Sequence, residues 1–469
     1  MVNLQNELEI SDEKQKKDNE YGADRTSKAV TYLRSILHKE DPVRNKNRPS
    51  KVSCPKVPPI LRDKERGEDN YDPRIVSLGP YHHGNPKFVA AQQIKPMFMQ
   101  QIISEHEKSI EHLYIEVFKL NEYTRSCYVV GSTEKYGDEE FALMMLQDGC
   151  FILCFIELVT SRKRDYISMI TDHLGLFEVQ YLHQDILLLE NQIPFRVLKV
   201  LMSNIFTENE GLEMVKSFLN ITHWGKSQQK DTRDKNEEPV HLLGLLKSQI
   251  SKHGRHKKPK RDNKDIDITS FLQSFGSVSD LNAKGINFKP SNSISLLSAL
   301  LNGKPKSISL RNVDFRLGFF TGELKLPPLI LDSDIQIYYM NLIAFELHTC
   351  TDFTVTSYIH FMNSLIASPE DVTALRSRRI ILHSLSSDKE VFKMLKEMSI
   401  PEGLQDFSIY QDVRKKIERH CDKKIKIWIA DIRHQYFSHP WSAISLLAAV
   451  VMLILIFLQT FFTIYPRKA

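Results

Sequence analysis

Apolar residues recur at helical spacing over most of the chain. Past Pro96, apolar side chains return every three or four residues over 110–118, which predicts one face of a long amphipathic helix. Residues 141–159, FALMMLQDGCFILCFIELV, are apolar on nearly every side, as in a central helix of a bundle. Residues 183–202 hold two apolar helical stretches separated at Pro194. These patterns predict a mainly helical body.

A different pattern after residue 285 predicts a small sheet. Three segments between 285 and 335, INFKP, SISLRNVDF and GELKLPPLILD, have alternating or β-branched runs with turn residues between them. Helical spacing returns in NLIAFELHT, TSYIHFMNSLIA and DVTALRSRRII. The predicted fold class is therefore mainly α with a small β component (α+β), in one globular body over 51–435.

Polar segments flank and interrupt this body. Residues 1–50 are polar and charged, which predicts a disordered leader. The proline-rich run CPKVPPILR then predicts an extended segment laid against the body. Residues 225–239 and 251–265 are charged, and we expect flexible loops there.

The last apolar run predicts a transmembrane helix. From Ala443 to Ile464 no residue is charged, which corresponds to roughly 33 Å of helix. Trp441 and Tyr465 flank the run, where aromatic rings suit the membrane interfaces. The alternative is a buried core helix. The predicted boundaries are a membrane helix over 441–465 and a short tail over 466–469.

Charge bounds the partners. The 63 basic and 58 acidic residues leave a formal net charge of only +5, which does not indicate nucleic acid as a partner. More basic residues precede the apolar run than follow it, which predicts a cytosolic body at the plasma membrane or an endomembrane. The preceding cluster would also suit anionic lipid, although a solvated helix face explains it equally well. Its members are Arg414, Lys415, Lys416, Arg419, Lys423, Lys424, Lys426 and Arg433.

Several short motifs occur in a characteristic order between Cys54 and Tyr465. They are KVPPILR, YDPRIVSLGPYHHG, FALMMLQDGCFIL, DILLLENQIPFRVL, HLLGLL, GELKLPPLILD, NLIAFE and YFSHPW, the last containing Pro440 and Trp441. Together they resemble the plant family called domain of unknown function 247, a large set of membrane-associated plant proteins. The resemblance implies no assigned catalysis. It implies a recognition role, because some members look like pollen-side determinants of self-incompatibility in grasses.

The motif turn GPYHHG carries two adjacent histidines. Because neighbouring side chains on a turn diverge, His82 and His83 are not expected to bind one metal ion together. We expect the glycines and proline to set the backbone while the histidines donate and accept hydrogen bonds with neighbouring loops. The turn residues are Gly79, Pro80, Tyr81, His82, His83 and Gly84.

Two carboxylates in an apolar stretch invite an acid–base hypothesis. Asp185 and Glu190 are five residues apart, which is a poor spacing for one helix face. We expect the polar run before the helix start to satisfy backbone groups at a helix junction. Asp148-Gly149 is expected to mark a helix break or cap. The junction residues are Glu190, Asn191, Gln192, Pro194 and Phe195.

Three functions therefore compete. The preferred one is a single-pass membrane-anchored interaction or recognition protein with an unknown protein partner, without catalysis and without a cofactor. The first alternative is a hydrolase or transferase that uses His82 or His83 with Asp185 or Glu190. The second is a nuclear-envelope protein that contacts nucleic acid through the basic run over 252–261, which contains no aromatic residue for base stacking.

Overall fold

The computed structural model divides the chain into two units, Met1–Lys51 and Val52–Ala469, and the described residues belong to the second. The predicted leader, the loop residues 252–265 and most of 225–239 lie outside the described part. The described ranges are 52–62, 70–161, 171–175, 178–207, 209–221, 238–251, 276–291, 309–318, 321–350, 352–400, 409–421 and 440–464.

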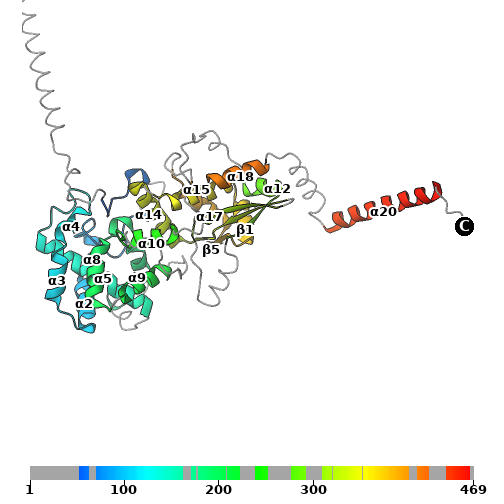
Figure 1. Ribbon diagram of the computed structural model, residues 1–469. Coiled ribbons are helices and arrows are strands. Elements are labelled where there is room, and N and C mark those ends of the chain that lie inside the picture. The colour runs from blue at the N-terminus through cyan, green and yellow to red at the C-terminus, as the bar shows by residue number, and fades with distance from the viewer. Residues whose placement is uncertain are drawn as a thin grey trace, which may run out of the picture. The chain divides into compact units, whose positions relative to one another are not determined.

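Helix α5, Asp138–Ser161, is the centre of the first half of this unit. The helices before and after it pack on its faces, as Figure 1 shows for α2, α3 and α8. Its apolar side chains are buried on nearly every side, which confirms a mainly helical body around a central apolar helix. The surrounding helices are α2 Val89–Glu105, α3 Ile110–Phe118, α4 Asn121–Ser126, α7 Glu178–Asp185, α8 Phe195–Ile205 and α9 Glu210–Ile221, with short 3-10 turns η2 Pro59–Leu61, η5 Pro86–Phe88 and η6 Leu189–Asn191.

The long amphipathic helix expected past Pro96 is two helices. α2 continues through Pro96 and ends at Glu105, and Glu107 then adopts a left-handed conformation with φ of 51°. α3 begins after Ser109, whose hydroxyl accepts a hydrogen bond from the His112 N–H at 3.2 Å. The apolar spacing correctly predicts the helix α3, but the predicted length is wrong because apolar spacing does not reveal the break at Glu107.

The helix break expected at Asp148-Gly149 is also wrong. α5 is continuous through both residues. Gly149 serves packing, because a Cβ atom there would overlap Leu201 Cδ1 of α8. Asp148 points out of the helix toward a partner segment described below. Tertiary contacts therefore explain both residues.

Two small sheets lie in the second half. β1, Ile286–Pro290, pairs in parallel with β3, Gly322–Leu326, and β2, Asp314–Leu317, pairs antiparallel with β3. β4, Leu329–Leu331, pairs in parallel with β5, Ile381–His383. The first sheet agrees with the predicted region.

The second sheet corrects the helix expected over DVTALRSRRII, because α16 ends at Ser377 and the chain enters β5. Arg379, with φ of 59°, turns the chain between the two elements. The helices of this half are α10 Leu242–Ser251, α12 Val278–Ala283, α14 Ser333–Thr349, α15 Thr354–Leu365, α16 Pro369–Ser377, α17 Asp388–Glu397 and α18 Gln411–Cys421.

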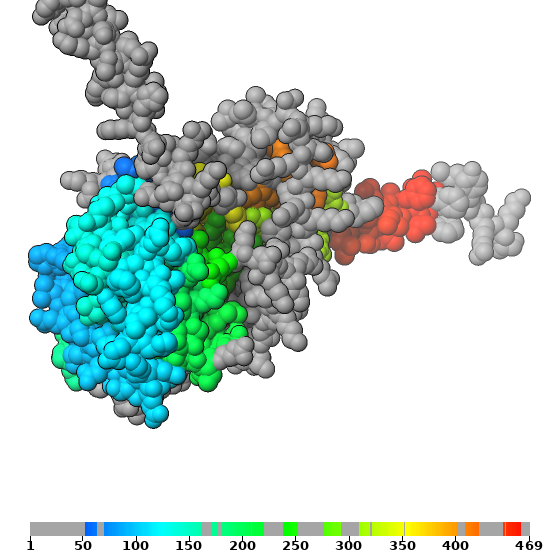
Figure 2. Space-filling model, turned by 60° about the vertical axis from the view of Figure 1, so that its left-hand side comes forward, coloured from blue at the N-terminus to red at the C-terminus, as the bar shows by residue number. Residues whose placement is uncertain are grey.

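Helix α14 joins the two halves. Asn341 on this helix accepts a hydrogen bond from the Leu189 N–H at 2.8 Å and donates one to the Asn70 carbonyl at 2.9 Å. Gln184 of α7 donates to Asp334 at 2.5 Å. One hydrophobic cluster runs through both halves, and Figure 2 shows the first half, in blue, cyan and green, as one closely packed surface. The halves therefore share a core.

The C-terminal helix α20 runs from Pro440 to Ile464. Its described apolar side chains are exposed, including Leu447 at 67% and Phe457 at 68%. By length and composition, the described helix that could cross a membrane is Asp138–Thr160 of α5, but 83% of its most apolar 18-residue stretch is buried within the protein, as expected of a core helix. Within α20 the comparable apolar stretch is Leu447–Thr460, which is shorter. Tyr465, the tail and the side chains of Pro440, Trp441, Ala443 and Ile464 lie outside the described part.

Candidate functional site

The motif residues meet around an extended segment over 74–79. Both carboxylate oxygens of Asp185 accept backbone hydrogen bonds, from the N–H groups of Arg74 at 2.9 Å, Ile75 at 2.7 Å and Val76 at 2.8 Å. Burial raises the pKa of Asp185 to about 6, although these amide donors favour the ionised form. Because its oxygens are engaged by the backbone, Asp185 holds the segment in place and does not face a cleft.

A buried ion pair holds the end of the same segment. Asp148 accepts a hydrogen bond from the Gly79 N–H at 2.7 Å and one from Lys95 Nζ at 2.5 Å. Lys95 also donates to the Ser77 carbonyl at 2.5 Å, and both charged side chains are 1% exposed. Gly79 has φ of 68°, and a Cβ there would lie 3.0 Å from the Gln192 carbonyl oxygen. Asp148 thus acts from the middle of α5 on a chain segment far away in sequence.

The amides of Asn191 and Gln192 complete the support. Asn191 accepts from the Leu78 N–H at 2.6 Å and donates to the Val76 carbonyl at 2.9 Å. Gln192 accepts from the Leu243 N–H at 3.1 Å and donates to backbone carbonyls of its own junction. Both side chains are almost fully buried. Each polar group is thereby paired where water is excluded.

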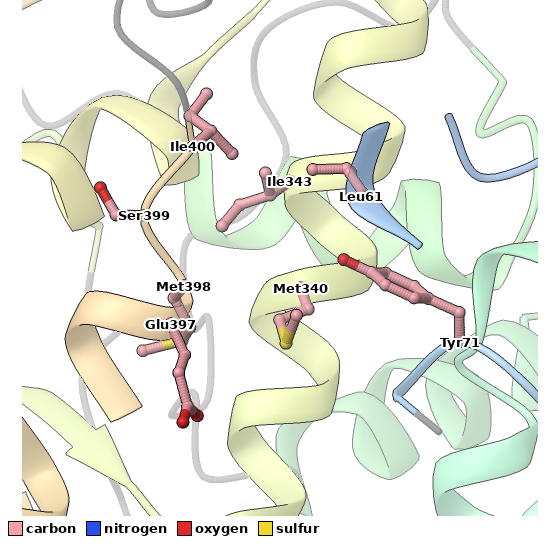
Figure 3. A pocket seen from close by; sticks show the side chains of 8 residues that line it. All are labelled: Leu61, Tyr71, Met340, Ile343, Glu397, Met398, Ser399 and Ile400. Atoms are coloured by element: carbon pink, nitrogen blue, oxygen red, sulfur yellow. The ribbon is translucent and has the colours of Figure 1, made fainter. Parts of the chain in front are cut away.

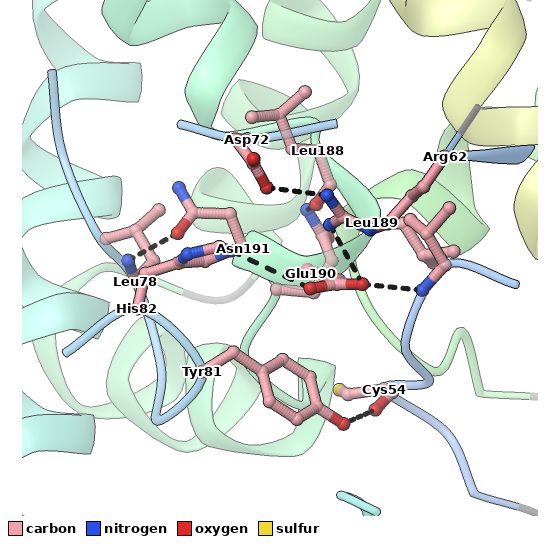
Figure 4. Close-up of polar contacts among 12 residues, drawn as sticks. Cys54, Arg62, Asp72, Leu78, Tyr81, His82, Leu188, Leu189, Glu190 and Asn191 are labelled. Atoms are coloured by element: carbon pink, nitrogen blue, oxygen red, sulfur yellow. Dashed lines mark hydrogen bonds and ion pairs between the residues drawn. The ribbon is translucent and has the colours of Figure 1, made fainter. Parts of the chain in front are cut away.

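Glu190 and His82 form the one approach between candidate catalytic groups that these motif residues show (Figure 4). Glu190 accepts the Val57 N–H at 2.7 Å and pairs with Arg62 at 3.1 Å, whereas His82 Nε2 lies 3.9 Å from its other oxygen. Burial lowers the pKa of His82, against the opposing effect of Glu190. A neutral imidazole beside a carboxylate is a possible acid–base pair. The carboxylate of Glu190, however, is already paired with the guanidinium of Arg62.

His83 faces a different group. Its ring meets Tyr136 edge-on with centroids 5.5 Å apart, and burial lowers its pKa. The expectation that the two histidines bond neighbouring loops fails at His82 Nε2 and His83 Nδ1, which have no hydrogen-bond partner in the described part of the chain. Two tyrosines make the loop contacts instead. Tyr81 donates to the Cys54 carbonyl at 2.6 Å, and Tyr136 donates to the Pro80 carbonyl at 3.1 Å.

A cavity lies away from these residues, between Leu61 of η2, Tyr71, helix α14 and the end of α17 (Figure 3). Its volume is about 10 Å³, which is room for about one water molecule. Small-molecule sites usually measure about 300–1,000 Å³. It is lined by Leu61, Tyr71, Met340, Ile343, Glu397, Met398, Ser399 and Ile400, none of which is a predicted site residue.

Sequence reasoning missed the partners of the motif residues. Lys95 and Arg62 neutralise Asp148 and Glu190, yet neither stood out as a candidate. The available signal was weak: Lys95 lies one residue after Ile94 and three before Phe98, both buried on the core side of α2. The basic run over 252–261, on which the nucleic-acid alternative depends, lies outside the described part.

The fold and the site define a mainly helical protein in which polar motif residues hold the extended segment over 74–79. A family model described as a plant protein of unknown function, DUF247, matches residues 54–455, and the chain belongs to this family. A UPF0481 protein of Arabidopsis thaliana is 28% identical over 415 residues, covering 83% of this chain and 82% of the relative. A putative UPF0481 protein of the same plant is 22% identical, covering 85% and 88%. No solved structure matches the chain.

Proposed function

We propose that this chain is a single-pass membrane protein whose helical body recognises another protein. The observation that carries the anchor is the exposure of α20: its 25 residues include no charged side chain, and the described apolar ones are open to the surroundings. Exposed apolar area of this extent is unfavourable in water, whereas a helix of about 20 apolar residues spans a bilayer. A core helix such as α5 has the opposite burial.

The charge before α20 supports a cytosolic body at the plasma membrane or an endomembrane. On α18, Lys415, Lys416 and Arg419 are exposed and available to anionic headgroups. Arg414 does not join them, because it is buried with its guanidinium 5.8 Å from the centre of the Phe361 ring. Within α18, a lipid contact would therefore depend on Lys415, Lys416 and Arg419.

Recognition fits the way the body uses its polar residues. The histidines and carboxylates of the motifs face buried backbone, arginine or tyrosine rather than a ligand-sized cavity. The surface meanwhile presents apolar side chains on α3, with Ile115 51% and Phe118 40% exposed. These two residues are three apart and therefore lie on one side of α3, where adjoining apolar side chains can contact a protein partner. A role in self-incompatibility would be one instance of such recognition.

Fractionation tests the anchor. Full-length tagged protein and a version ending before Pro440 are expressed in plant cells, and membranes are washed with carbonate and pelleted. We expect the full-length chain in the pellet and the shortened chain in the supernatant. Protease added to sealed vesicles should digest the body. Intact chain in the supernatant without detergent would contradict the proposal.

Affinity capture tests recognition. Full-length protein is compared with the double variant Ile115→Asp, Phe118→Asp, which changes exposed positions and should leave the fold intact. We expect a partner captured by the wild type and lost with this variant. The matched control is Glu111→Gln, Glu116→Gln on the same helix. A set of captured proteins that is identical for all three chains would argue against this surface.

A further inference from the structure

An imidazole and two carboxylates meet where α2 ends against α5. Glu105 is the last residue of α2, His106 follows it, and Glu157 lies on α5. Their donor atoms all lie within 4.8 Å of one another. The two helices are packed side by side (Figure 1). We propose that Glu105, His106 and Glu157 bind a divalent transition-metal ion, for which Zn²⁺ is the representative.

The donor set and its spacing suit zinc. Imidazole nitrogen and carboxylate oxygen are both ordinary zinc ligands. His106 Nε2 lies 3.7 Å from Glu157 Oε2, which is too long for a hydrogen bond. Two ligands on tetrahedral zinc with bonds of about 2.0–2.1 Å are about 3.4 Å apart. Glu105 is exposed, and rotation about its side-chain bonds would bring its carboxylate to the ion.

The electrostatic setting favours a cation. Glu157 is 5% exposed on a helix whose other faces are apolar, and a buried carboxylate is costly unless positive charge balances it. The C-terminal end of α2 adds the negative end of a helix dipole at the same place. Two carboxylates and this helix end place negative charge around the His106 imidazole. A divalent ion would balance this charge.

Packing holds the ligands in position. The His106 ring meets Phe206 edge-on, with centroids 4.9 Å apart and an interplanar angle of 77°. The His106 N–H donates to the Ile102 carbonyl at 3.3 Å, which ties the residue to the end of α2. Gln101 donates to Glu105 at 2.8 Å, an outer contact of the kind that orients metal ligands. Three protein donors would leave one tetrahedral position for water.

Zinc binding by the full-length protein in detergent tests this site. Chelator-stripped protein is titrated with Zn²⁺ against a chromophoric chelator. We expect one equivalent bound by the wild type and binding at least about tenfold weaker for His106→Asn and for Glu105→Gln, since loss of even an outer contact costs on the order of 10- to 100-fold. His112→Asn, which removes an exposed histidine from α3, is the control and should bind like the wild type.

A second readout separates binding from folding. Zn²⁺ should raise the melting temperature of the wild type and of His112→Asn, but not that of Glu105→Gln. Glu105 is exposed, so this variant keeps its fold even if His106→Asn does not. If His106 and Glu157 form only an ion pair, the wild type will bind no more zinc than Glu105→Gln. That result would overturn the proposal, whatever the outcome for the membrane anchor.

Discussion

Helices α5 and α20 are both long and largely apolar, and their surroundings are opposite. α5 is buried in the body, whereas the described side chains of α20 are exposed. α5 also carries Asp148 and Glu157, and α20 carries no charged residue. A buried helix keeps a carboxylate such as Asp148 because a neighbouring chain segment supplies its partner, whereas a charge on a helix facing lipid would be costly. Hydropathy alone does not distinguish them.

Charging the middle of each helix should give different failures. Leu453→Arg with Ile456→Arg in α20 should cost about 5–7 kcal/mol of membrane insertion, at about 2.5–3.5 kcal/mol per arginine, and move the protein from pellet to supernatant. Leu453→Phe with Ile456→Phe should stay in the pellet. Leu153→Arg in α5 should instead unfold the body, measured by circular dichroism. Retention of the double arginine chain in carbonate-washed membranes would break the comparison.

The second-largest effect should come from removing Lys95, the partner of the buried Asp148 on α5. Lys95→Met leaves Asp148 buried and unpaired, and we expect a loss of about 3–5 kcal/mol in the free energy of unfolding. Lys199→Met removes one partner of an exposed pair with Glu238 and should cost at most about 1 kcal/mol. Denaturant unfolding in detergent measures both. Adding Asp148→Asn to Lys95→Met should restore part of the loss, and equal costs for the two lysines would refute a special role for the buried pair.

Helix α14 carries another buried carboxyl group, Glu346, whose contribution to stability should depend on pH. Glu346 is fully buried, accepts the N–H groups of Val355 at 3.0 Å and Thr356 at 2.9 Å, and lies 3.9 Å from Lys247. Burial raises its pKa from 4.5 to about 7, partly offset by Lys247. The folded state therefore binds this proton more tightly than the unfolded state. The stabilisation is fully present below pH 4.5 and is lost as the pH rises through about 7.

Comparing the wild type with Glu346→Gln isolates this effect. The stability of the wild type relative to the variant should fall by about 3 kcal/mol between pH 4.5 and pH 8, at about 1.4 kcal/mol per pKa unit. Unfolding by denaturant at several pH values measures the difference, and the pH-independent cost of the amide cancels. A difference that is constant with pH would show that folding does not raise the pKa of Glu346.

The smallest effect concerns the close approach of α8 to α5. Gly149→Ala should gain helix propensity but force Leu201 to move, with a net loss of about 1 kcal/mol. Gly137→Ala meets open space and should be neutral or slightly stabilising. Combining Gly149→Ala with Leu201→Ala tests the contact, because the two costs should not add. Additive costs would mean that the helices do not meet there.

The sequence predicted more of the fold than of the site. The apolar run over 141–159 located the buried centre of α5. The strands of the first sheet were visible as alternating runs. The parallel partner of β4 was not, because β5 lies about fifty residues further along the chain and has only three residues.

For the candidate site, the sequence identified the polar motif residues but not the groups to which they bind. Asp185 accepts hydrogen bonds from backbone N–H groups that lie 109–111 residues away in the sequence, and Asp148 lies 53 residues from Lys95. No local spacing encodes such pairs. The same applies to His106 and Glu157, which come from separate helices. The trio at the end of α2 was accordingly not among the predicted site residues.

By itself the sequence determined the helical character of the body, the family, and an apolar C-terminal segment that is unfavourable in water. These depend on the composition and periodicity of neighbouring residues, which act over a few turns of chain. Only the tertiary structure decided which apolar helix is a core and which buried charges are paired. Burial and charge compensation come from segments that are distant in sequence and adjacent only after packing.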